Sequence, residues 1–150
     1  MGACANLGVV VVDVLTEIDI DRGVEDVAGY VADPANAPEW YANIDSVEVH
    51  DDDTATFVAR FLGRRLEYTY ELDLVPGERL VMRTRQGPFP METTYTWAPN
   101  ADGGTHVTLR NRGEPAGFSK LVAPFMAPAM RRANRKDLER LKALLEGGAT

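Results

Sequence analysis

The sequence predicts an α+β fold in which a curved antiparallel sheet of about seven strands surrounds one long C-terminal α-helix, with two short helices after the first strand. The order of elements indicates this fold. One alternating strand and a proline-broken helical stretch come first, about six strands follow, and an amphipathic helix closes the chain. Because one long helix covers a sheet with large inward side chains, we expect a space between them.

The first strand is predicted over residues 12–20. Its inward face carries Val12, Val14, Thr16, Ile18 and Ile20, and Leu15 is a misfit on the otherwise acidic outer face. Apolar residues at helical spacing then predict a short helix that begins at Val24. It ends at Asp33-Pro34, because a residue before proline avoids the α region. A second short helical turn begins at Pro38 and leads through Trp40-Tyr41 into the next strand.

Six further alternating segments follow, near residues 47–50, 56–61, 65–74, 80–85, 91–97 and 106–111. The clearest is 65–74, in which leucines and tyrosines alternate with charged residues and threonine. Turn signals separate the segments, among them Gly63-Arg64, Pro76-Gly77 and Gly87-Pro88. The short connections predict an antiparallel meander.

From residue 121 the apolar period changes to that of a helix. The apolar stripe consists of Leu121, Val122, Phe125, Met126, Ala129, Met130, Ala133, Leu138, Leu141, Leu144 and Leu145. Arginine and lysine fill the opposite face. Pro124 and Pro128 each remove a backbone donor, so we expect the front of this helix to be kinked or split. Gly147-Gly148 ends it.

Composition narrows the classes of partner and site. A chain of 150 residues fits one domain, with 1–10 as an N-terminal extension, expected to be flexible, and 147–150 as a tail. The net charge of −7 argues against nucleic acid as a partner. With one cysteine and two histidines, we expect no disulfide, no metal site and no cofactor. No segment approaches the ~20 apolar residues of a membrane span, and no basic signal region opens the chain. We therefore expect a cytoplasmic protein without integral membrane association, and its oligomeric state stays open.

Several short segments together carry a family resemblance. They are Glu17-Ile18-Asp19-Ile20 through Val24, Asp33-Pro34 with Pro38-Glu39-Trp40, Gly103-Gly104-Thr105, and Leu138, Leu141-Lys142 and Leu145-Glu146. From about Val11 to Glu146, the chain resembles the START-like (SRPBCC) superfamily with its helix-grip fold. Within it, the chain is most similar to the polyketide cyclase/dehydrase and lipid-transport group. That fold hosts carriers, hormone receptors, cyclases and co-chaperones, so the resemblance implies one START-like domain more firmly than one activity.

The inward faces of the strands and the helix predict a ligand pocket. Its expected ligand-binding residues are Trp40, Phe57, Phe61, Tyr68, Tyr70, Met82, Thr84, Met91, Thr93, Tyr95, Trp97, Asn111, Leu121, Phe125, Met126 and Met130. Each polar atom among them needs a partner, or its burial costs roughly 1–3 kcal/mol. Water or a ligand in a cavity would supply partners, and apolar walls with a few polar groups are typical of small-molecule sites.

Three functions remain open on the sequence alone. The first is binding or carriage of a hydrophobic small molecule, lipid-like or polyketide-like. The second is a polyketide cyclase/dehydratase, in which Tyr68, Tyr70 or Tyr95 would donate a proton while the general base is unknown. Strict alternation places no carboxylate on an inward strand face. The third is a protein-interaction module of the co-chaperone type. A carboxylate, histidine or arginine in the pocket would favour the enzyme, and a pocket filled by side chains would favour the interaction module.

Overall fold

The computed structural model describes residues 12–41, 43–51, 53–61, 63–86, 90–113 and 123–147. Its elements are β1 (Val12–Ile20), α1 (Val24–Val31), the 3-10 helix η2 (Pro34–Asn36), α2 (Ala37–Trp40), β2 (Ile44–Asp51), β3 (Thr54–Phe61), β4 (Arg64–Val75), β5 (Arg79–Gln86), β6 (Met91–Pro99), β7 (Thr105–Gly113) and α3 (Ala123–Gly147). The predicted helix-grip fold is confirmed. The extension at 1–10 lies outside the described residues.

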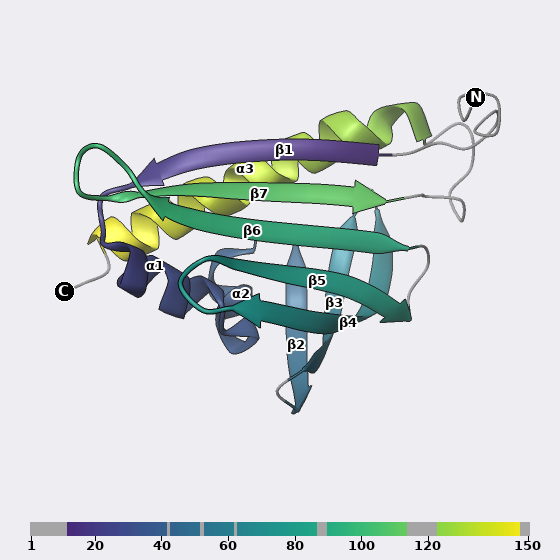
Figure 1. Cartoon of the computed structure of the whole chain (residues 1–150). Coiled ribbons are helices and arrows are strands. Elements are labelled where there is room, and N and C mark those ends of the chain that lie inside the picture. Colours follow the sequence, from purple (N-terminus) through teal and green to yellow (C-terminus); the bar gives the residue numbers. More distant parts are fainter. Residues whose placement is uncertain are drawn as a thin grey trace, which may run out of the picture.

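All seven strands form one antiparallel sheet in the order β1-β7-β6-β5-β4-β3-β2. Figure 1 shows the sheet curling from β1 towards β2, with α3 along its inner side and α1 and α2 at one end. The inner side of the sheet is therefore covered by α3 along its length and by α1 and α2 at one end. No helix in the described part of the chain is long and apolar enough to cross a membrane.

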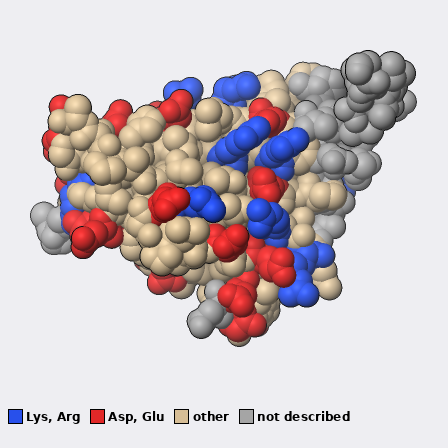
Figure 2. Space-filling model, viewed as in Figure 1, with Lys and Arg blue, Asp and Glu red and all other residues tan. Residues whose placement is uncertain are grey.

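The two faces of the sheet differ as the alternation predicts. Inward residues such as Val14 and Leu109 are buried, whereas Leu15, the predicted misfit, is 56% exposed on the outer face. Figure 2 shows basic and acidic side chains interspersed on the outer face. The pair between Asp13 and Arg110, at 2.6 Å, is one example. Exposed pairs of this kind contribute little to stability because water screens them.

The glycine pair before β7 allows the first and last strands to meet. Gly103 has a φ of +82°, a backbone conformation that residues with a side chain rarely adopt. A Cβ on Gly104 would lie 2.4 Å from the carbonyl oxygen of Ile20, so only glycine permits this approach. Thr105 then donates its hydroxyl to the carbonyl of Arg22, at 2.7 Å.

Of the kink or split expected in the last helix, the split is wrong, because α3 is one continuous helix from Ala123 to Gly147 with Pro128 inside it. Pro124 lies in the first turn, where a backbone N–H has no helical partner in any case. Pro128 removes one hydrogen bond of the helical ladder, but the turns on either side continue. The buried stripe of Met126, Leu138 and Leu141 packs into the core, and that packing holds the helix together.

The outer face also contains a pH-dependent contact. His106 lies 2.7 Å from a carboxylate oxygen of Glu17 and 3.1 Å from one of Asp19, and hydrogen bonds to these two groups raise its pKa above 6.5. A raised pKa contributes stability that is present below the unfolded pKa and lost as the pH rises through the folded pKa. We expect His106→Gln to lower the denaturant midpoint slightly at pH 5.5 and not at pH 9. An equal loss at both values would contradict this assignment.

Candidate functional site

A cavity of about 130 Å³ lies between the inner side of the sheet and α3. Its lining comprises Tyr41, Asn43, Ile44, Phe57, Ala59, Arg60, Leu66, Tyr68, Tyr70, Met82, Met91, Thr93, Tyr95, Asn111, Met130, Ala133, Asn134 and Asp137. Most of this wall is apolar. An engineered apolar cavity of ~150 Å³ holds benzene, so the present cavity is the size of one ring. The exposed residues Asn43 and Arg60 mark its mouth.

The structure brings together many of the residues that were predicted to bind a ligand. Phe57, Tyr68, Tyr70, Met82, Met91, Thr93, Tyr95, Asn111 and Met130 all line the cavity. The strand residues among them lie on β3 to β7, where the period of two turns every second side chain inward. Ligand contact by these residues stays a prediction.

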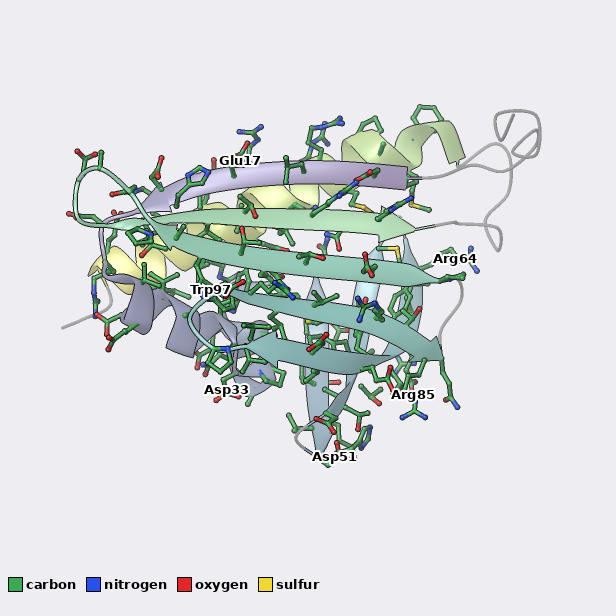
Figure 3. All side chains as sticks on the ribbon, in the orientation of Figure 1. Glu17, Asp33, Asp51, Arg64, Arg85 and Trp97 are labelled. Carbon is green, nitrogen blue, oxygen red and sulfur yellow. The ribbon has the colours of Figure 1, made fainter. Side chains whose placement is uncertain are left out.

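Other predicted residues lie elsewhere. Trp40, Trp97 and Met126 are buried in the core and do not line the cavity. Figure 3 shows Trp97 at the end of the sheet nearest α1. Thr84 accepts a hydrogen bond from the backbone N–H of Met91, at 3.0 Å, and lines a separate surface hollow.

Phe125 is a correction to the sequence analysis, since its side chain is 65% exposed. It precedes the fully buried Met126 by one position, and one position rotates a helical side chain by about 100°. Leu121 and the side chain of Phe61 lie outside what the structure describes.

The buried Tyr95 and the partly buried Tyr41 form a polar pair in the wall of the cavity. The hydroxyl of Tyr95 donates to that of Tyr41 at 2.5 Å, which leaves the proton of Tyr41 for a third group. Trp40 packs edge-on against both rings. Burial raises the pKa of each tyrosine, and the charge of Asp137 raises both further. Both hydroxyls therefore stay protonated at neutral pH and act as donors. Sequence reasoning missed Tyr41 because it lies in a connection without periodicity.

A chain of side-chain hydrogen bonds crosses from the sheet to α3. Thr93 donates to Asn111 at 2.5 Å, and Asn111 donates to the amide oxygen of Asn134 at 3.0 Å. The amide nitrogen of Asn134 is buried and has no hydrogen-bond partner among the described residues. A buried donor without a partner costs roughly 1–3 kcal/mol, and a ligand carbonyl in the cavity would relieve that cost.

Asp137 supplies a carboxylate that the sequence analysis did not anticipate. It lies on α3 one turn after Asn134, is 8% exposed, and lines the cavity. Hydrophobic periodicity does not identify Asn134 or Asp137, because the apolar stripe of the helix runs through Ala133 and Leu138 beside them. The available signal was polar residues at positions 134 and 137, between the buried Met130 and Leu141 on the same face. Among the described residues, no group of three potential ligands is placed to hold a metal ion.

A protein-family model described as polyketide cyclase/dehydrase and lipid transport matches residues 11–146. The chain belongs to this family. The resemblance drawn from its short sequence segments is therefore confirmed. A search of curated proteins gave no match.

Several solved structures have the same fold. A protein of Thermus thermophilus superposes with a TM-score of 0.80 at 20% identity, over 92% of this chain and 99% of that chain. The Zhui aromatase/cyclase from a Streptomyces species gives 0.79 at 14% identity, over 91% and 94%. A START superfamily protein from Mycobacterium smegmatis gives 0.67 at 15% identity, over 91% and 95%. At these identities the similarity concerns the fold alone.

Proposed function

We propose that the protein binds a ring-sized, mostly apolar molecule that carries a carbonyl group, in the cavity between the sheet and α3. The unpartnered amide nitrogen of Asn134 carries this proposal, because it is a buried donor on a residue that lines the mostly apolar cavity. The protonated Tyr41–Tyr95 pair offers a second donor. The small cavity favours a ring over an extended acyl chain, and an unfilled cavity weighs against a pure interaction module.

The test is titration of the purified protein with acetophenone, followed by ligand-observed NMR or calorimetry. We expect saturable binding that Ala59→Phe weakens, since Ala59 lines the cavity and a larger side chain would fill it. Leu15→Phe is the matched control on the outer face. Absence of binding at millimolar ligand, or an equal loss in both variants, would refute the proposal.

Asp137 favours a second candidate, an enzyme of the cyclase/dehydratase type. The carboxylate would remove a proton from the carbon between two carbonyls, and the electron pair of that C–H bond would move to a carbonyl oxygen. Tyr41 and Asn134 would donate hydrogen bonds to the resulting enolate oxygen. The enolate carbon could then attack a second carbonyl of the same chain, whose π electron pair moves to its oxygen as the ring bond forms. The protonated carboxyl of Asp137 would return its proton to that alkoxide oxygen. In this mechanism Asp137 would be the general base, which is unknown from the sequence alone.

A further inference from the structure

A second hollow adjoins the cavity on the surface. It has a volume of about 360 Å³, and it shares Asn43, Arg60 and Ala133 with the cavity. Its remaining lining is Gly63, Ala129, Arg132 and Lys136. We call this hollow the basic vestibule. Because three residues line both spaces, a molecule that fills the cavity and extends past its mouth enters the basic vestibule.

The lining of the basic vestibule is positively charged. Among the residues that the structure describes, it contains Arg60, Arg132 and Lys136 and no carboxylate. Arg60 uses its Nε to bond Asp45 at 2.9 Å, which leaves the other donors of its guanidinium for a further group. Among the described residues, Arg132 and Lys136 have no ion pair, although the whole chain carries a net charge of −7.

The spacing on α3 explains how an apolar cavity and a charged hollow share one wall. Asn134 and Asp137 face the cavity, and Arg132 and Lys136, one turn apart, face the adjoining side of the same helix. Ala133 lies between the two sets and lines both spaces. Its side chain is a single methyl group, so it takes up little room at the boundary of the two spaces.

We propose that the ligand is amphipathic: its ring occupies the cavity, and an anionic group, carboxylate or phosphate, binds Arg132 and Lys136 in the basic vestibule. This inference rests on the proposed binding function and adds the charge of the ligand to it. A guanidinium binds carboxylate or phosphate through paired hydrogen bonds, and an ammonium contributes a compact charge beside it. A neutral ligand would leave these cations without a partner in the bound state.

The test compares three probes that share a phenylpropyl group, by isothermal titration calorimetry. They are 3-phenylpropanoate, 3-phenylpropyl phosphate and 3-phenylpropan-1-ol. We expect one or both anions to bind about five- to tenfold more tightly than the alcohol, and this preference to shrink at high salt. Preference for the carboxylate indicates a free acid as the natural ligand, and preference for the phosphate indicates a phosphate-bearing compound.

Two variants locate the effect. The double change Arg132→Gln and Lys136→Gln should bring the anions to the affinity of the alcohol. Arg135→Gln is the matched control, because Arg135 is an exposed cation on the same helix outside the basic vestibule. Equal affinity for the anions and the alcohol in the unchanged protein would overturn this inference and leave the proposed binding intact. The inference would also be overturned if Arg135→Gln lowered the affinity for the anions as much as the double change does. If acetophenone binds and none of the three probes does, this inference fails while the proposed binding function stands; the proposed function fails only if acetophenone does not bind either.

Discussion

Replacing Asp137 by Asn should slow carbon-acid chemistry in the cavity by about 10²- to 10⁴-fold, the range expected when a general base is lost. The amide keeps the shape of the carboxylate but cannot accept the proton. The measurement is enzyme-dependent exchange of the C2 hydrogens of a β-keto thioester for deuterium, followed by NMR. This exchange reports enolate formation without knowledge of the natural substrate.

Glu139→Gln is the control for the Asp137 experiment, since it removes an exposed carboxylate from the same helix. It should leave the exchange rate unchanged. If Asp137→Asn retains the full rate while the unchanged protein accelerates exchange, Asp137 is not the base. If the unchanged protein binds the thioester without accelerating exchange, the protein is a binding protein and not an enzyme of this type.

Leu141→Ala should lower the free energy of unfolding by about 2–5 kcal/mol. Leu141 is fully buried on α3, in the core cluster that joins the helix to the sheet, and truncation would leave a cavity there. Leu141 does not line the ligand cavity, so ligand affinity per folded molecule should stay nearly constant.

Denaturant titration of Leu141→Ala beside Leu15→Ala checks this expectation. Leu15 is the same residue type on the exposed outer face, where truncation should change the free energy of unfolding by less than about 0.5 kcal/mol. Similar losses in the two variants would mean that α3 does not stabilise the sheet in the way the burial implies. Phe125→Ala, at another exposed position, should change neither stability nor binding much.

Most of the fold could be predicted, because the spacing of apolar residues identifies both the type of each element and the face that it buries. Tyr68, Tyr70 and Tyr95 reach the cavity for that reason. Periodicity does not extend to the connection that holds Tyr41, so its contact with Tyr95, 54 residues away in the chain, required the structure.

The helix shows a second limit of periodicity. Its inward face is wide enough to include neighbouring positions, and hydrophobic periodicity assigns the cavity wall to the apolar ones among them. That assignment includes the exposed Phe125 and omits the polar Asn134 and Asp137. The cavity is therefore more polar, and better suited to chemistry, than the apolar stripe indicated.

The position of β1 beside β7 has a consequence for biosynthesis. Ile20 pairs with Thr105 and Val12 with Gly113, so the first strand to be synthesised has no neighbour until the last strand is made. A meander from β2 to β7 can form through local hairpins as the chain emerges, but β1 must wait through that interval with its apolar face uncovered. The acidic residues that alternate along it, Asp13, Glu17 and Asp19, repel a second copy of the same strand. We therefore expect this charge repulsion to disfavour pairing between the β1 strands of two incomplete chains.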